Sequence, residues 1–350
     1  MDAMSLLVLI VMFVGSGAVT WLAGVVLTKT TDTLDHRFKI GDAIGGLVLL
    51  GIAGSLPEIA VVYSAAVHDH IPVILGTLIG GLSIQTLIVV LFDAASGRER
   101  PLSYVAGSAM LSFETLFAVA VTIIALLAVL VPARLSVFHI NPLSAGLLIA
   151  WVAGLFLINK ARQVPRFNET AEDAAPGRKH HERRHQKPRT FFAGKSTLHV
   201  ILVFLGASAI TLIAGWLLEE SGNAIAGKLG IGTGIFAATF IALATSIPEI
   251  STGLESIFIG DNHLAVSDIM GGNAFMLVLF LFADLVARKP VLNTAERSDI
   301  VFGVLALAMM SVYAVSFLKR PRKCYFRLGI DSILALLLYI GGAILITRIR

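Results

Sequence analysis

Two short apolar segments of this chain nearly repeat each other, and each contains one glutamate. The first reads Gly54-Ser55-Leu56-Pro57-Glu58-Ile59, and the second reads Thr245-Ser246-Ile247-Pro248-Glu249-Ile250. A carboxylate at the centre of a bilayer costs roughly 2.5–3.5 kcal/mol on insertion scales. Because the chain carries this cost twice, in matching contexts, we expect both carboxylates to bind a cation or a proton.

Each glutamate follows a proline, which shapes the backbone around it. Pro57 and Pro248 lack a backbone N–H, so each disturbs the preceding turn and frees carbonyl oxygens. Freed carbonyls and two carboxylates form an oxygen-rich, sulfur-free set of the kind that hard cations such as Ca²⁺ prefer. Two carboxylates would neutralise one divalent ion, or bind monovalent ions or protons singly. The hydroxyls that would join them are those of Ser55, Thr245 and Ser246.

The composition indicates a membrane protein. Apolar residues make up 56% of the chain and charged residues only 14%, whereas soluble domains hold about 25% charged residues. The apolar runs are continuous rather than alternating, which favours helices over strands. We therefore predict an all-α polytopic membrane protein with ten transmembrane helices. Stretches of roughly 20 apolar residues, the length that spans a bilayer, lie at about 4–27, 42–66, 71–93, 103–131, 141–159, 197–218, 231–257, 264–286, 299–317 and 329–347.

The basic residues predict the orientation. With the N-terminus outside, the cytoplasmic loops hold 20 of the 27 Lys and Arg residues, in agreement with the positive-inside rule. Both termini are then outside, and the protein is predicted to be integral to a bacterial inner (plasma) membrane. The first apolar stretch is read as a span because it lacks a basic leading region. The net charge of +4 resides in loops, so it does not indicate nucleic-acid binding.

The chain divides into two related halves. Residues 1–159 form a first five-span repeat, 160–196 a basic, His-rich cytoplasmic loop, and 197–350 a second five-span repeat. An odd number of spans per half predicts an inverted-topology repeat, the plan of many secondary transporters. Matching positions lie 191 residues apart and pair Glu58 with Glu249, Ala23-Gly24 with Ala214-Gly215, Ile40-Gly41 with Ile231-Gly232, Gly80-Gly81 with Gly271-Gly272, and Asp93 with Asp284.

The two glutamate motifs, each followed about 18 residues later by a Gly-rich helix, resemble the alpha repeats of the calcium/cation antiporter superfamily. The sodium/calcium exchanger-like branch fits best, and the resemblance covers nearly the whole chain. It implies exchange of Ca²⁺ or a related divalent cation against H⁺ or Na⁺ by alternating access. Glu58 and Glu249 would be the central metal ligands, and Thr245 matches the family's hydroxyl one turn earlier. Gly51 and Ala242 match its carbonyl donors.

The Gly-rich helices depart from the family pattern, which reads roughly Gly-Asn-x-x-Gly-Ser-Asn-x-x-Asn. The family's serine ligands become Gly81 and Gly272 here, so oxygen ligands are missing, mainly those of separate Na⁺ sites. Gln85 and Asn273 remain as polar candidates. Asp268 lies one turn from the lost ligand of the second copy, on the same helix face. We hypothesise that it supplies a third carboxylate; the alternative is a helix-start Asp favoured by the helix dipole.

Other signals indicate alternatives. His181-Glu182-Arg183-Arg184-His185 matches the H-E-x-x-H motif of zinc proteases, but it lies in a basic loop, so a membrane metalloprotease is the less favoured reading. A family member that senses or scaffolds without transport is another. We expect no enzyme activity and no cofactor besides the transported cation; the sequence leaves the oligomeric state open. Other acids and histidines are weaker candidates for proton or ion contacts. Glu114 and Glu255 are predicted within spans, Asp93 and Asp284 at the membrane interface, and His68 and His70 in an outer loop.

Overall fold

The computed structural model describes residues 4–38, 52–96, 100–164, 192 and 194–349, and this part of the chain is mostly helical. Polar caps start several helices: the side-chain oxygens of Ser108, Asn141 and Ser196 each accept a backbone N–H from the first turn that follows. The elements of the first half are α1 (Leu6–Phe38), α3 (Leu56–Val67), α4 (Ile71–Leu75), η2 (Gly76–Gly80), α5 (Gly81–Ser96), α6 (Leu102–Val105), α7 (Ala109–Val129), η3 (Ala133–Leu135) and α8 (Pro142–Arg162).

The second half continues in the same manner and adds one short hairpin between its last two long helices. The hairpin turn consists of Phe326 and Arg327, both at positive φ, as a two-residue turn of this kind requires. The elements are α10 (Thr197–Leu229), α11 (Thr233–Phe236), η4 (Ala237–Ile241), α12 (Ala242–Thr245), α13 (Ile247–Ile259), α14 (Asn262–Met276), α15 (Leu279–Ala287), η5 (Val291–Thr294), α16 (Arg297–Lys319), β1 (Cys324–Tyr325), β2 (Leu328–Gly329) and α17 (Ile330–Ile349).

Seven helical segments of the described chain are long and apolar enough to cross a membrane. An eighth is counted if Thr233–Thr245 and Ile247–Ile259, which meet at a bend of 46°, form one span. The described part of the predicted span 42–66 overlaps the apolar helix Leu56–Val67, and the predicted span 329–347 contains the apolar helix Ile330–Ile346. The all-helical membrane class is therefore confirmed, and the count of ten stays a prediction.

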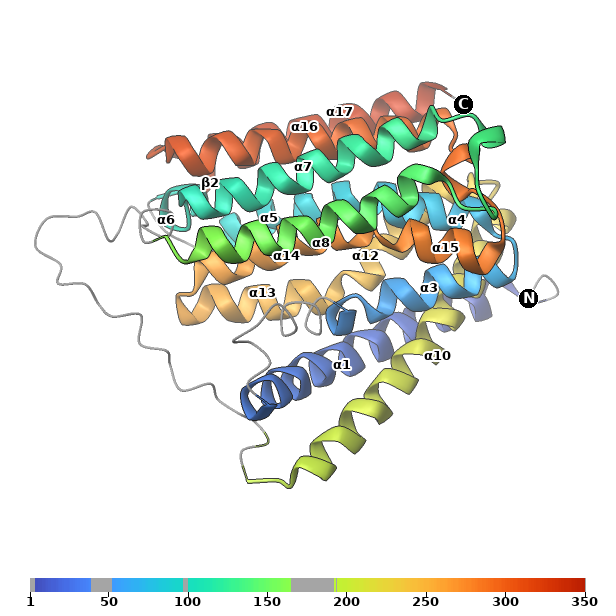
Figure 1. The fold of residues 1–350 in the computed structure, drawn as a ribbon, viewed down its shortest axis with the longest axis horizontal. Coiled ribbons are helices and arrows are strands. Elements are labelled where there is room, and N and C mark those ends of the chain that lie inside the picture. The colour runs from blue at the N-terminus through green and yellow to red at the C-terminus, as the bar shows by residue number, and fades with distance from the viewer. Residues whose placement is uncertain (1–3, 39–51, 97–99, 165–191, 193, 350) are drawn as a thin grey trace, which may run out of the picture.

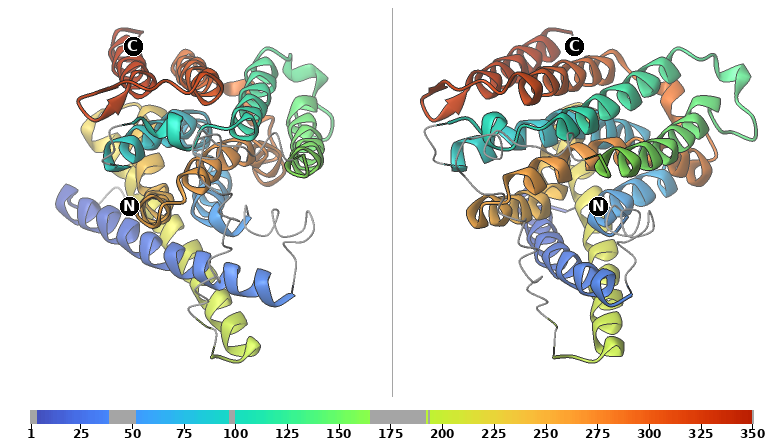
Figure 2. Two further views of the ribbon diagram at one scale, coloured as in Figure 1. Left: turned by 90° about the vertical axis from the view of Figure 1, so that its left-hand side faces the viewer. Right: turned by 60° about the vertical axis from the view of Figure 1, so that its left-hand side comes forward.

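The helices are arranged in layers around the glutamate motifs (Figure 1). α1 and α10 pack most extensively against each other and form one side of the molecule, whereas α16 and α17 lie on the opposite side (Figure 2). Between them, α13 packs against α14 and α5, whereas α3 packs against α10 and α15. Because both glutamates lie at the starts of α3 and α13, the motifs are enclosed by helices from both halves.

Two π-helical segments cross at the centre. η2 interrupts the span Ile71–Ser96, and η4 interrupts the span that precedes Glu249. Gly80 of η2 lies directly against Ala238 of η4, where a Cβ on the glycine would clash. Ser267–Gly271, which matches η2 at the 191-residue offset, is regular helix within α14. The two halves are therefore not identical next to the site, and π-helical turns of this kind are frequent at functional sites.

Candidate functional site

Glu58 lies in the first turn of α3, directly after the predicted break. Residues 52–54 are helical, Ser55 forms a turn, and α3 begins at Leu56 with Pro57 in its first two positions. The Glu58 side chain is fully buried, and neither carboxylate oxygen has a hydrogen-bond partner among the described residues. Since a buried carboxylate without a partner is costly, this position is suited to holding a cation or a proton.

Glu249 occupies the equivalent place in the second half. Ser246 breaks the helix, α13 begins at Ile247, and Pro248 again lies in the first two positions. The turn residues have nearly the same backbone conformation, with φ −92° and ψ 15° at Ser55 and φ −84° and ψ 1° at Ser246. Oε2 of Glu249 is buried without a hydrogen-bond partner in the described chain. The sequence repeat therefore corresponds to a repeated local structure.

The two carboxylates lie close enough to interact electrostatically. Glu249 interacts electrostatically with Glu58 and, more weakly, with Asp268 of α14. Like charges in a low-dielectric interior repel each other strongly, so the arrangement is favourable only when a cation or protons are held there. The Asp268 side chain is exposed on α14, which places this third carboxylate at the rim of the pair rather than between the two glutamates.

The predicted hydroxyl ligands lie at the two helix breaks, Ser55 before α3 and Thr245 with Ser246 before α13. Thr245 approaches the Glu58 carboxylate, but its hydroxyl donates to the carbonyl of Ala242 at 3.1 Å. Ser55 and Ser246 are both buried, and neither side chain caps the helix that it precedes. Each hydroxyl therefore lies at a helix break, beside its own Pro-Glu motif in the chain, without serving the helix start.

The two expected backbone ligands are the carbonyl oxygens of Ala242 and Gly51. The Ala242 carbonyl accepts both the Thr245 hydroxyl and the Ser246 N–H, each at 3.1 Å. Both lone pairs of this carbonyl oxygen are therefore engaged within its own helix. Gly51 lies outside the described residues.

The neighbouring spans contribute further polar atoms. Gln85 of α5 is buried, and its Oε1 has no hydrogen-bond partner among the described residues. A Cβ on Gly272 of α14 would lie 3.8 Å from this Oε1. The Asn273 amide donates to Thr86 Oγ1 at 3.2 Å and leaves its Oδ1 unpartnered within the described chain. The buried, unpartnered hydroxyl of Thr77 in η2 was not predicted as a ligand, although its four-residue spacing from Gly81 and Gln85 could have indicated it.

The glycine pairs behave differently in the two halves. Close helix packing is expected at Gly80-Gly81 and Gly271-Gly272. Gly80 meets this expectation, and a Cβ on Gly81 would lie 2.8 Å from the end of Met276. Gly271 has no neighbouring atom within 4 Å of its Cβ position, so the expectation is wrong for the second pair. At Gly272, the position of the missing serine, a Cβ would be in ordinary contact with Gln85 Oε1 at 3.8 Å.

Glu114 forms a structural link between three helices. Its carboxylate pairs with Arg162 of α8 at 2.9 Å and accepts the Ser267 hydroxyl of α14 at 2.6 Å. Because an arginine already balances its charge, its partners account for Glu114 without any role in ion binding. Glu255 is exposed on α13.

Asp93 and Asp284 are both buried within the protein, near the ends of α5 and α15. Asp93 accepts the N–H groups of Leu102 and Gly329, each at 2.7 Å. Asp284 accepts those of Val291 at 2.8 Å and Asn141 at 3.0 Å. Each aspartate thus binds a nearby loop of its own half and the start of the last long helix of the other half. Such buried backbone donors need an acceptor, which is the reason that the charges lie inside. The H-E-x-x-H motif of the central loop, His181-Glu182 and His185, lies outside the described residues.

Comparison with known sequences identifies related proteins. A family model described as sodium/calcium exchanger protein matches residues 8–159 and 198–347. Inner membrane protein YrbG of Escherichia coli (strain K12) is 27% identical over 262 residues, which are 73% of this chain and 72% of that protein. Putative antiporter CaxA of Alkalimonas amylolytica is 31% identical over 108 residues, 30% of this chain and 34% of that protein.

Comparison with solved structures identifies the same architecture. The crystal structure of the H⁺/Ca²⁺ exchanger CAX matches with a TM-score of 0.67 and 14% identity, covering 97% of this chain and 86% of that chain. A structure of the sodium-calcium exchanger NCX_Mj matches with a TM-score of 0.55 and 16% identity, covering 97% of this chain and 98% of that chain. At such identities the likeness concerns the fold alone.

Proposed function

The chain belongs to the sodium/calcium exchanger protein family, and on that premise we propose that it is a secondary antiporter of Ca²⁺ or a related divalent cation. The counter-ion is H⁺ or Na⁺. The observation that carries the proposal is the pair of carboxylates, Glu58 and Glu249, which lie at equivalent helix starts, interact electrostatically with each other and lack sufficient hydrogen-bond partners in the described chain. Two negative charges match one divalent ion, and the same oxygens can hold protons or Na⁺ when that ion leaves.

The other predicted ligands complete an all-oxygen site. The buried hydroxyls of Ser55, Thr245 and Ser246 at the two helix breaks would join the carboxylates, and the unpartnered amide oxygens of Gln85 and Asn273 would come from the neighbouring spans. Oxygen donors of mixed charge are the ligands that Ca²⁺ selects, whereas borderline metals prefer nitrogen or sulfur. Asp268 is assigned a supporting role at the rim, where it attracts the ion to the pair.

Alternating access would arise from the two halves. We propose ten spans in two inverted repeats, with the site at the midplane between them. Hydrogen bonds between the two halves support this plan. Asp93 and Asp284 each accept a backbone N–H at the start of the other half's last long helix. Because each half thereby holds the other at equivalent points, the molecule has two related arrangements in which one entrance or the other can open.

The relatives favour transport over the other readings. One is named a putative antiporter, and two structural neighbours are titled exchangers, one for H⁺ with Ca²⁺ and one for sodium with calcium. An enzyme of the zinc-protease kind would need an ordered third ligand and a bound water, for which the described residues offer no support at the glutamate site. Integral membrane location follows from the spans, and the inner-membrane relative supports a bacterial inner membrane. That both termini lie outside remains a proposal from the distribution of basic residues.

Flux measurements in liposomes test the proposal. Purified protein is reconstituted, and uptake of Ca²⁺, Mn²⁺ and Mg²⁺ is followed under an imposed Na⁺ gradient, an imposed H⁺ gradient, and neither. Gradient-driven divalent uptake that protein-free liposomes lack is the expected result, and the gradient that drives it names the counter-ion. No divalent flux under either gradient would instead favour a sensor or scaffold.

A further inference from the structure

The turn between α3 and α4 brings two histidines against α10, away from the glutamate site. Asp69 adopts a left-handed conformation with φ 60° and reverses the chain between His68 and His70. The two imidazole rings are stacked, with centroids 5.8 Å apart. Both rings face a pair of adjacent acids, Glu219 and Glu220, on α10.

The donor atoms of this cluster lie close enough to share one metal ion. His68 Nδ1 lies 3.2 Å from Glu220 Oε1, and one ligand atom from each of His68, Glu219 and Glu220 lies within 4.8 Å of the others. Ligands at about 2.0–2.1 Å around a tetrahedral zinc are separated by about 3.3 Å. Small rotations of the partly exposed His68 and Glu220 side chains would therefore complete the geometry.

Hydrogen bonds hold the most buried member of the cluster in place. The Glu219 side chain is fully buried; its Oε2 accepts the Ser64 hydroxyl at 2.7 Å, and its Oε1 pairs with His70 Nδ1 at 2.8 Å. The other ring nitrogen of His70 lies 3.1 Å from the Asn223 amide. Such outer contacts orient ligands in metal sites and commonly change metal affinity 10- to 100-fold. Here they fix one carboxylate, while His68 and Glu220 remain adjustable.

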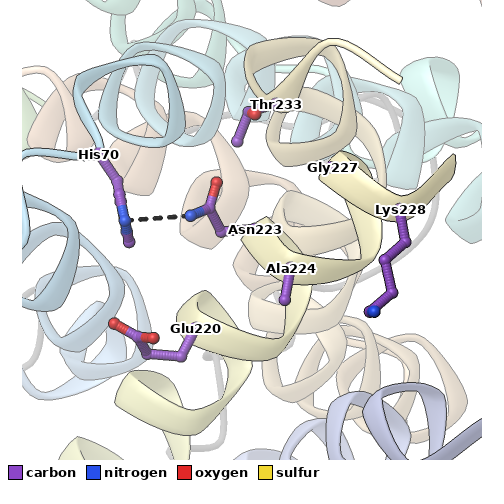
Figure 3. Close-up of a pocket in the computed structure, with 7 residues that line it drawn as sticks. All are labelled: His70, Glu220, Asn223, Ala224, Gly227, Lys228 and Thr233. Atoms are coloured by element: carbon purple, nitrogen blue, oxygen red, sulfur yellow. Dashed lines mark hydrogen bonds between the residues drawn. The ribbon is translucent and has the colours of Figure 1, made fainter. Parts of the chain in front are cut away.

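A cavity gives solvent access to the same place. It encloses about 440 Å³ and is lined by His70, Glu220, Asn223 and Lys228, together with small residues. Figure 3 shows the Glu220 side chain directed toward the space that His70 and Asn223 border. An ion could therefore reach His68 and the two acids without passing through the transport site.

We propose that His68, Glu219 and Glu220 form a second metal site, selective for a borderline transition-metal ion such as Zn²⁺. One imidazole with two carboxylates suits Zn²⁺ better than Ca²⁺, which prefers oxygen alone. Without metal, His68 Nδ1 lies 2.9 Å from the Ser64 carbonyl, so binding through that nitrogen releases its proton. The bound ion would join the α3–α4 turn of one half to α10 of the other.

Zinc titration of purified, untagged full-length protein tests this site. The reference protein carries His180→Asn, His181→Asn and His185→Asn, which removes the central-loop histidines, and Glu58→Gln, which alters the transport site. Calorimetry should detect about one Zn²⁺ per chain. His68→Ala and Glu220→Gln should each weaken binding roughly tenfold or more, in line with the loss of one ligand. Zinc absorption spectra should report imidazole nitrogen together with oxygen in the reference protein.

The control is His139→Ala, which removes an exposed histidine in the turn between Val137 and Ile140 and should leave zinc affinity unchanged. Glu220→Gln is the variant least expected to disturb the fold, because the Glu220 side chain is partly exposed and pairs with His68. Gel filtration checks the folding of each variant. Unchanged binding in both ligand variants, a spectrum without imidazole, or no binding by the reference protein would overturn the assignment. Because the reference lacks an intact Glu58 carboxylate, these results do not depend on the proposed exchange activity.

Discussion

Gly24 of α1 lies directly against Pro248 of α13, so that a Cβ on the glycine would come within 2.7 Å of the proline Cγ. At the 191-residue offset the relationship recurs: Gly215 of α10 lies against Ala60 and Pro57 of α3. Each of these long helices therefore covers the glutamate motif of the other half. Only a residue without a side chain permits this approach, which explains why both matched positions are glycine.

Alanine at Gly24 should destabilise the protein although alanine favours helices. The substitution gains about 0.5–1 kcal/mol in helix propensity, but overpacking against Pro248 costs typically about 1–3 kcal/mol. Gly24→Ala should lower the melting temperature in detergent and slow exchange. Gly227→Ala on α10 provides the matched control, because nothing lies within 4 Å of its Cβ position, and should melt at the same or a higher temperature. Equal behaviour of the two variants would contradict the packing argument.

Removing either central charge should abolish exchange. Glu58→Gln and Glu249→Gln preserve shape but leave one negative charge where a divalent ion needs two. Both variants should insert and purify normally while gradient-driven divalent uptake falls to the level of empty liposomes. Glu255→Gln, which changes an exposed glutamate on the same helix α13, should keep normal uptake. Retained exchange in both central variants would show that the transported ion binds elsewhere.

The sequence was sufficient to predict the membrane class and the repeated helix starts, because hydropathy and the Pro-Glu motif are local signals. It did not predict the π-helical segments, whose dihedrals barely differ from an α-helix: Gly76, the first residue of η2, has φ −60° and ψ −48°. The buried roles of Asp93 and Asp284 were also missed. Their acceptor function depends on N–H groups such as that of Asn141, 143 residues from Asp284, and no local pattern encodes such a distance.

Asp268→Asn should weaken divalent binding without abolishing transport. Asp268 interacts electrostatically with Glu249, yet its side chain is exposed, so solvent screens much of the attraction. We expect a three- to tenfold rise in the divalent concentration at half-maximal uptake, equivalent to about 0.7–1.4 kcal/mol, with the maximal rate retained. The effect should shrink at high salt. An unchanged half-maximal concentration would show that Asp268 does not contribute to the site. The alternative of a helix-start Asp is wrong, because α14 begins at Asn262 and its first turn contains no acidic residue.

Asp93→Asn and Asp284→Asn should reduce stability by similar amounts, because each aspartate forms an equivalent hydrogen bond to the other half of the chain. Each carboxylate accepts two buried backbone N–H groups, and an asparagine can accept with only its carbonyl oxygen. A buried N–H left unpaired costs about 1–3 kcal/mol, so thermal unfolding should occur at clearly lower temperature in both variants. Asp69→Asn is the control, since its ion pair with Lys289 is exposed and surface pairs contribute at most about 1 kcal/mol. A large loss in only one of the two variants would mean that the halves are not joined in the equivalent manner that the hydrogen bonds indicate.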